Sequence, residues 1–160
     1  MIIGSSDSEV ISGNRGADSI SGAEGADTIY GGKNNDLCYG NRGSDLLIGG
    51  NGEDLLQGGK GDDFIIGASG NDTLSGDLGN DTLTGGEGND VFILRNNSSG
   101  TNLITDFQLG IDLLQLPTGI SFDNLEIRDR GSNSVISLNG ENLAIINSIP
   151  ARAISDVDFI

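Results

Sequence analysis

Glycine recurs at every ninth residue from Gly4 to Gly85, and this short period constrains the fold more than any other feature of the sequence. Ten copies of the nine-residue unit run without insertion from residue 4 to residue 93. With the recurring glycine as position one, position six is aspartate in nine of the ten repeats and position eight is apolar in all of them. A unit this short has no core of its own and gains burial only by stacking on its neighbours. The period therefore predicts a solenoid.

The order of residues within each repeat predicts an all-β solenoid with two repeats in each coil. Positions one to six are rich in turn-forming residues. The three residues around position eight can form only a very short strand, whose middle side chain points one way and whose flanking side chains point the other. Each repeat is then half a coil of eighteen residues. Two narrow parallel sheets would face each other with the position-eight side chains between them, Cys38 included as a buried small apolar residue.

This thin core needs a further source of stability. One apolar side chain for every nine ordered residues does not offset the conformational entropy of folding. The chain has a net charge of −16 with 35% hydrophobic residues, a balance typical of disordered chains. Cations that neutralise the aspartates would supply the missing free energy. A solenoid with merely solvated aspartates would not need that residue at every ninth place.

The composition excludes several classes of function. Excess negative charge repels nucleic acid and anionic membranes, and no apolar run reaches about 20 residues, so we expect neither nucleic-acid binding nor membrane insertion. With no histidine and one cysteine, zinc sites built from Cys and His, disulfides, and Ser-His or Cys-His catalytic pairs are excluded. We therefore expect no enzymatic activity, and a hard, oxygen-ligated metal such as calcium is the remaining kind of ligand.

Stacking places the aspartates of alternate repeats in two ladders, because each repeat lies on the repeat after next at a spacing of about 4.8 Å. Carboxylates at that spacing repel one another unless a calcium ion between neighbours accepts an oxygen from each. Four gaps on one edge and three on the other predict about seven calcium ions, and the gap between Glu9 and Asp27 offers an eighth. The first edge consists of Asp18, Asp36, Asp54, Asp72 and Asp90, and the second of Asp27, Asp45, Asp63 and Asp81.

The repeats resemble the Gly-Gly-x-Gly-x-Asp-x-U-x unit of the RTX family of secreted bacterial calcium-binding proteins, where U is a large apolar residue. Residues 49–54, Gly-Gly-Asn-Gly-Glu-Asp, are a close copy of the first six positions of that unit. The resemblance covers 90 of the 160 residues. It implies a right-handed parallel β-roll over residues 4–93, an extracellular location, and calcium sites completed by the backbone carbonyl groups of turn positions one to four. The turn residues implied as ligands are Asn14, Gly16, Ala23, Gly25, Gly31, Gly32, Lys33, Asn34, Gly40, Asn41, Arg42, Gly43, Gly49, Gly50, Asn51, Gly52, Gly58, Gly59, Lys60, Gly61, Gly67, Ala68, Ser69, Gly70, Gly76, Leu78, Gly85 and Glu87.

Residues 94–160 break the period and predict a C-terminal β cap. Residues 95–100 are predicted to form a loop, and residues 104–116 resemble the segment that commonly follows the last repeat in the RTX family. For Asp106 and Asp112, a further calcium ion and a turn role are both open. Residues 134–138 and 141–146 flank Asn139-Gly140, which is typical of a two-residue β-hairpin. We expect this cap to seal the roll and shield its edge from aggregation.

The two ends of the sequence indicate an export route. The N-terminal residues lack a basic stretch followed by an apolar one, so we expect no cleavable signal. Residues 156–160 resemble the uncleaved C-terminal signal of type I secretion substrates. The leading hypothesis is a calcium-binding module, exported by the type I secretion machinery, that folds on meeting calcium outside the cell. The alternative is a calcium-dependent carbohydrate-binding or adhesion module with an extracellular polysaccharide as partner.

Overall fold

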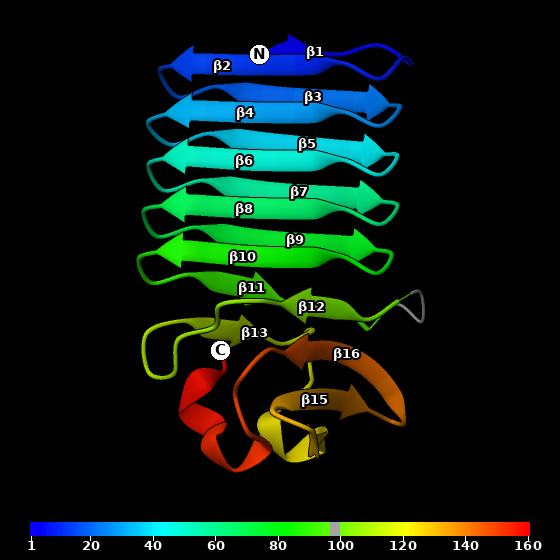
Figure 1. Ribbon diagram of the computed structural model, residues 1–160, viewed down its shortest axis with the longest axis vertical. Coiled ribbons are helices and arrows are strands. Elements are labelled where there is room, and N and C mark those ends of the chain that lie inside the picture. The colour runs from blue at the N-terminus through cyan, green and yellow to red at the C-terminus, as the bar shows by residue number, and fades with distance from the viewer. Residues whose placement is uncertain (97–99) are drawn as a thin grey trace.

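Two parallel β-sheets face each other along the body of the protein in a computed structural model that describes residues 1–96 and 100–160 (Figure 1). Successive strands alternate between the sheets, so that odd-numbered strands β1 to β13 form one sheet and even-numbered strands β2 to β12 lie in the other. The strands are β1 (Ile2–Ile3), β2 (Val10–Arg15), β3 (Ser19–Glu24), β4 (Thr28–Lys33), β5 (Leu37–Arg42), β6 (Leu46–Asn51), β7 (Leu55–Lys60), β8 (Phe64–Ser69), β9 (Thr73–Leu78), β10 (Thr82–Glu87), β11 (Val91–Ile93), β12 (Asn102–Ile104) and β13 (Leu113–Gln115).

Parallel neighbours along the repeats are offset by eighteen residues, which confirms the predicted coil of two repeats: Ile11 pairs with Ile29, and Ile20 with Cys38. The predicted strand length is wrong, because β2 to β10 are each six residues long rather than three. After the three residues around position eight, the pairing passes over position one and resumes at positions two and three of the next repeat. The turn proper is thus confined to positions four to six.

The core of the roll is a single row of position-eight side chains. From Ile20 to Phe92 these side chains are fully buried, and Ile11 at the N-terminal end is nearly so. Cys38 lies buried in this row, as predicted for a small apolar residue. Burial, with the nearby carboxylates of Asp36 and Asp54, raises the pKa of the Cys38 thiol to about 12. A core one side chain thick leaves the aspartates of the turns close to the protein interior.

Left-handed backbone at two positions of the repeat explains 12 of the 22 glycines within residues 4–93. Position two and position four have positive φ in nearly every repeat, for example 114° at Gly50 and 136° at Gly52. Asn34 takes the place of glycine at position four with φ 77°, in line with the tolerance of asparagine for this region. A Cβ on Gly52 would lie 2.5 Å from the carbonyl oxygen of Asn34 in the coil before it. Glycine is therefore required there by conformation and by the close stacking of the turns.

Both sheets continue past the last repeat. Strand β12 pairs with β10 and β13 pairs with β11, so the C-terminal segment extends the roll rather than beginning a separate body. Strands β14 (Leu125–Arg130), β15 (Asn133–Leu138) and β16 (Glu141–Ile146) then form an antiparallel sheet joined to β12 through β16. The predicted hairpin is present, because Leu138 pairs with Glu141 across Asn139 and Gly140, both of which have positive φ.

The last residues of the chain cover the edge of the first sheet. The backbone N–H of Leu116 donates to the carbonyl of Ile160 at 3.0 Å, and the N–H of Ile160 donates to the carbonyl of Leu114 at 3.1 Å. The rings of Phe159 and Phe122 pack with their centroids 5.3 Å apart. The short 3-10 helices are Phe122–Asn124, Ala151–Ala153 and Asp156–Asp158.

Residues 94–96 and 100–101 lie outside any strand, whereas residues 97–99 of the loop predicted over residues 95–100 fall outside the described part of the chain. Across the described ranges, no helix has the length and apolar character needed to cross a membrane.

Candidate metal centre

The position-six aspartates form two hydrogen-bonded ladders, one along each turn edge of the roll. In each, the backbone N–H of one aspartate donates to the Oδ1 atom of the aspartate eighteen residues further on, at 2.8–3.0 Å. The two edges contain the residues assigned to them from the eighteen-residue coil. All of these aspartates except Asp18 are at most 3% exposed. Each ladder is thus a file of carboxylates held at fixed spacing inside the protein.

The second oxygen of every ladder carboxylate lacks a hydrogen-bond partner among the described residues. Nine Oδ2 atoms are buried in this way, one from each position-six aspartate between Asp18 and Asp90. A buried charged oxygen without a partner is costly, and native proteins avoid it unless a metal ion, a proton or water compensates. The regular recurrence of the same unpartnered atom indicates one common ligand along both ladders.

The position-one glycines make room for these oxygens. A Cβ on Gly31 would lie 2.8 Å from Oδ2 of Asp36 and 2.7 Å from the carbonyl oxygen of Gly49 in the next coil. Gly13 stands in the same relation to Asp18 and to the carbonyl of Gly31. Carboxylate and carbonyl oxygens therefore converge on the space that any larger residue would fill. Oxygen donors of these two kinds are the ligands that calcium prefers.

The backbone groups implied as ligands lie in the turns beside the ladders, where positions one to four of each repeat end one strand and begin the turn. Several position-three carbonyls already accept a hydrogen bond from the preceding coil, for instance Ser69 from the N–H of Gly52 at 2.9 Å and Lys60 from that of Gly43 at 2.8 Å. A carbonyl oxygen has a second lone pair, so this bond leaves one acceptor direction. The side chains of Arg15, Lys33, Arg42 and Lys60 are exposed at this position, so only their backbone can serve the ladders.

Burial changes the protonation of the ladder in the absence of metal. Desolvation raises the pKa of Asp63 and Asp72 to about 7 and that of Asp81 to about 6, with neighbouring carboxylates adding to the effect. The pKa values of Asp36, Asp45, Asp54 and Asp90 are raised for the same first cause. A bound cation would act in the opposite direction, because it favours the ionised carboxylate.

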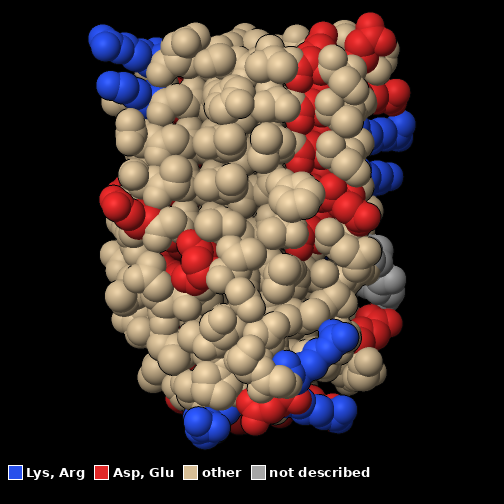
Figure 2. All heavy atoms as spheres, viewed as in Figure 1, with Lys and Arg blue, Asp and Glu red and all other residues tan. Residues whose placement is uncertain are grey.

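The distribution of charge agrees with a cation-binding edge. Figure 2 shows acidic side chains gathered in a stripe along a turn edge of the roll, with basic side chains projecting at the outer rims. No three Asp, Glu or Cys side chains converge on one point within residues 1–96 and 100–160. Any ion in a ladder would therefore depend on backbone carbonyls for most of its ligands, as the glycine-lined turns allow.

Comparison with known families decides the ligand. The RTX calcium-binding nonapeptide repeat, in four copies, matches residues 3–38, 39–74 and 66–95. The chain belongs to this RTX family. RTX repeats are structural calcium-binding modules, so residues 3–95 form a calcium-binding β-roll.

Two solved structures resemble the RTX chain at low identity. Extracellular lipase LipA from Serratia marcescens is 16% identical with a TM-score of 0.43, over 98% of this chain and 39% of the lipase. The AlgE6R3 subunit of the Azotobacter vinelandii mannuronan C5-epimerase is 23% identical with a TM-score of 0.40, over 98% of this chain and 80% of the subunit. The chain thus spans well under half the length of the lipase. No curated protein matches the sequence.

The three remaining candidate carboxylates all have backbone partners. Glu9 accepts the N–H of Ser5 at 2.7 Å through Oε2. Asp106 accepts the N–H groups of Gly85 and Gly86, one on each oxygen, at 2.9 Å. Asp112 accepts the N–H of Asp90 at 3.1 Å and that of Gln108 at 2.8 Å. For Asp106 these bonds match the turn role, one of the two roles left open by the sequence. Asp112 differs, because it accepts the N–H of Asp90 in the way that each ladder aspartate accepts the N–H of the one before it.

A second, outer ladder at position five of the RTX repeats was not predicted. The side-chain oxygens of Asn35, Asp62 and Asn71 each accept the backbone N–H of the position-five residue in the next coil, at 2.8–3.1 Å. Position five varies among Ala, Ser, Asn, Asp and Glu, so no single residue type at this position predicts the outer ladder. The frequency of Asn and Asp there was the available signal, since short polar side chains readily bond to nearby backbone.

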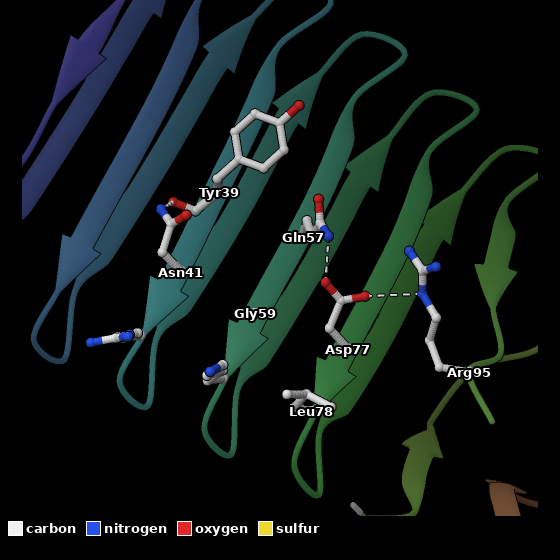
Figure 3. A pocket seen from close by; sticks show the side chains of 9 residues that line it. Tyr39, Asn41, Gln57, Gly59, Asp77, Leu78 and Arg95 are labelled. Carbon is white, nitrogen blue, oxygen red and sulfur yellow. Dashed lines mark hydrogen bonds and ion pairs between the residues drawn. The ribbon is translucent and has the colours of Figure 1, made fainter. Parts of the chain in front are cut away.

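The outer face of the first sheet carries a groove of about 640 Å³ on β5, β7 and β9 (Figure 3). Tyr39, Asn41 and Gln57 line it together with Asp77 and Arg95. Asp77 is fixed by Gln57, by the Ser75 hydroxyl at 2.7 Å and by Arg95 at 3.1 Å. The groove is thus an open polar surface with one aromatic ring, whereas the ladders consist of buried carboxylates. Its remaining lining residues are Arg42, Gly59, Lys60 and Leu78.

Proposed function

We propose that the chain is a calcium-triggered folding module, which takes up about seven ions within the repeats outside the cell and so supports the secretion and folding of a type I exported protein. The observation that carries this proposal is the row of nine buried Oδ2 atoms without hydrogen-bond partners among the described residues. A calcium ion beside these atoms would neutralise their negative charge and accept them as ligands. The protein supplies carboxylates at fixed spacing and turns open enough for carbonyls to face them.

The proposed ions lie in the gaps between successive aspartates of one ladder. Four gaps separate Asp18 and Asp90 on the first edge, and three separate Asp27 and Asp81 on the second. An aspartate inside a ladder would serve the gap on either side, one oxygen to each. Carbonyls of turn positions one to four complete each set of ligands. Seven divalent ions carry +14 against a formal charge of −16, which removes most of the repulsion in the folded state.

The same chemistry supports a role in export. Extracellular calcium modules bind with dissociation constants of about 10⁻⁴–10⁻³ M, well above cytosolic calcium and near extracellular calcium. The chain would then stay unfolded in the cytosol and fold after export. Residues 156–160, the proposed secretion signal, support this order of events, because Asp158 is buried and Ile160 is hydrogen-bonded to β13 in the folded protein. Folding therefore fixes the backbone of this segment against β13, while the side chains of Val157 and Ile160 stay exposed.

Circular dichroism of the full chain at fixed free calcium tests the proposal. At sub-micromolar free calcium we expect a largely disordered spectrum, and at about 1 mM a β-sheet spectrum, with magnesium at equal concentration as the control. Calorimetry on the same samples counts the ions. A full β-sheet spectrum in chelator, or fewer than three ions bound, would sink the proposal.

The groove in Figure 3 supports a second candidate, calcium-dependent binding of an extracellular polysaccharide. An aromatic ring beside amide and carboxylate groups offers both an apolar contact and hydrogen bonds to a sugar. The groove lies across β5, β7 and β9, so it exists only when calcium has folded the roll. A glycan array probed in calcium and in chelator, with Tyr39→Ala as the variant and the exposed Tyr30→Ala as the control, decides it. Binding that is absent, or equal in both variants, counts against this candidate.

A further inference from the structure

We infer that each calcium ladder is closed by one residue of the C-terminal segment, Asn102 on the second edge and Asp112 on the first, and that these residues complete two calcium sites beyond the seven within the repeats. The inference rests on the proposed calcium function and adds two sites to it. Neither residue belongs to a repeat, and the nine-residue period does not reach either of them.

The hydrogen bonds of the two residues continue the ladders. The N–H of Asp81 donates to Oδ1 of Asn102 at 3.3 Å, and the N–H of Asp90 donates to Oδ1 of Asp112 at 3.1 Å. Within the repeats, the same bond joins each aspartate to the next one in its ladder. Asn102 and Asp112 therefore occupy the place of the next ladder aspartate, and both are buried.

The unpartnered oxygens give independent support. Asp81 and Asp90 end the repeat series, yet their Oδ2 atoms are buried without a hydrogen-bond partner in the described part of the chain, like those of the seven aspartates before them. If ions lay only between repeat aspartates, the Oδ2 atom of the last aspartate in each ladder would have no cation to bind. Nine such oxygens match seven gaps between aspartates plus one gap after Asp81 and one after Asp90.

The chemistry of the two closing residues explains why the ladders stop there. An asparagine side chain has only one acceptor oxygen, and its other terminal atom is an N–H donor that repels a cation. Asp112 has two oxygens, but its Oδ2 accepts the N–H of Gln108 at 2.8 Å, whereas Oδ2 of every repeat aspartate in the ladders has no partner among the described residues. Each closing residue therefore has the oxygen that faces the gap before it and lacks the unpartnered oxygen that would face a gap beyond it.

The N-terminal end of the second edge is closed by the same principle. Oε2 of Glu9 lies by Gly4 where Oδ2 of a ladder aspartate would be, and it accepts the N–H of Ser5 at 2.7 Å. Glu9 is absent from the set of unpartnered oxygens. The N–H of Glu9 does donate to Oδ1 of Asp27 at 2.9 Å, so the ladder bond continues to Glu9, but this gap lacks the unpartnered oxygen of the others. On this inference it holds no ion, and the additional ions lie at the C-terminal end.

The test is an ion count on the full chain at saturating calcium, by equilibrium dialysis with elemental analysis. We expect nine ions for the unmodified chain, eight for Asn102→Leu, eight for Asp112→Leu and seven for the double variant. Asn142→Leu and Asp129→Leu are matched controls, because they remove the same groups from the same segment away from the ladders, where Asn142 bonds to Ser137 and Asp129 to Ala151. Both controls are expected to bind nine.

Two milder variants keep the inference testable if a leucine variant fails to fold. Asn102→Asp adds a negative charge at the end of the second edge. Calorimetry should show that the site between Asp81 and residue 102 binds calcium several-fold more tightly. Asp112→Asn keeps an acceptor for the N–H of Asp90 and should weaken one site several-fold. An ion count that does not change in the leucine variants, or affinities unmoved in the milder variants, overturns the inference and leaves the proposed function intact. Fewer than three ions in the unmodified chain overturns the proposed function itself.

Discussion

The repeats and the C-terminal antiparallel sheet solve the same problem of stability in different ways. Between β2 and β11 the core is one row of side chains, and each turn buries a carboxylate oxygen without a partner among the described residues. In the segment from β14 to β16, Ile136, Leu143 and Ile146 are buried at the C-terminal end of the continuous apolar core, and no such oxygen is found there. On the proposed function, the first region needs calcium to fold, whereas we expect the apolar side chains of the second to stabilise it without a ligand. Five experiments test this contrast between the two regions.

Removal of calcium should have the largest effect. Hydrogen exchange followed by mass spectrometry should show rapid exchange of amides in β4 to β9 in chelator. Peptides covering β15 and β16 should keep slower exchange, because three strands with an apolar face can retain structure. Equal loss of protection in both regions would contradict the contrast, and retained protection in β4 to β9 would contradict the calcium account.

Removal of one ladder charge should have the second-largest effect. Asp63 lies between Asp45 and Asp81, so Asp63→Asn should weaken two ions and raise the calcium midpoint of folding about tenfold, or ~1.4 kcal/mol. Its neighbour Asp62 is an exposed member of the outer ladder, and Asp62→Asn keeps the acceptor for the N–H of Asn80. Calorimetry should therefore separate the two variants. Equal calcium midpoints of folding in the two variants would show that calcium binding does not depend on the charge of the ladder aspartates.

A core variant in the C-terminal sheet should lower stability without changing the ion count. Ile136 is fully buried, and Ile136→Ala should cost about 2–5 kcal/mol in urea unfolding at saturating calcium. Val135 points to the other face and is only half-buried, so Val135→Ala should cost less. A reduced ion count in Ile136→Ala would mean that this region is not independent of the ladders.

The pH dependence should have opposite sign with and without calcium. In metal-free protein the raised pKa values of Asp63 and Asp72, about 7, make the folded state bind more protons than the unfolded chain. That contribution to stability is present below pH ~4 and is lost as the pH rises through about 7. Calcium-depleted protein should thus show more β-structure at pH 5 than at pH 8. Calcium affinity should instead fall as the pH is lowered below about 7, and a metal-free fold that is better formed at pH 8 would count against this reasoning.

The smallest effect is expected in the outer ladder. Asn71 accepts the N–H of Asn89 at 2.8 Å on an exposed turn, so Asn71→Ala should cost about 1 kcal/mol. Asn71→Asp keeps the acceptor and should cost less. Thermal unfolding in saturating calcium distinguishes them, and a loss as large as that of Asp63→Asn would give the outer ladder a role in calcium binding.

The sequence was most informative where the period is strict. Repetition at eighteen residues predicted the two sheets, the buried row from Ile11 to Phe92 and the two edges, because stacking fixes which residues are neighbours. Asn139-Gly140 predicted the hairpin, since that pair favours positive φ. The strand length was mispredicted because positions one to three carry turn residues yet still pair with the next coil.

The ends of the ladders could not be read from the period. Asp81 and Asn102 are 21 residues apart and Asp90 and Asp112 are 22 apart, so the extra residues after the last repeat shift both closing residues out of phase. Asn102 also differs in type from the residues whose place it takes. Only three-dimensional stacking brings it beneath Asp81, and only its single acceptor oxygen shows why it ends the ladder.

On the proposed function, calcium binding and folding of the repeats are one process. A calcium titration of the full chain tests this claim, with bound ions followed by an indicator or electrode and β-structure followed by circular dichroism in the same samples. We expect the two curves to rise at the same free calcium, with at least seven ions bound when the spectrum is complete. A β-sheet spectrum that is complete before calcium is added, or ion uptake that leaves the spectrum unchanged, would contradict the claim.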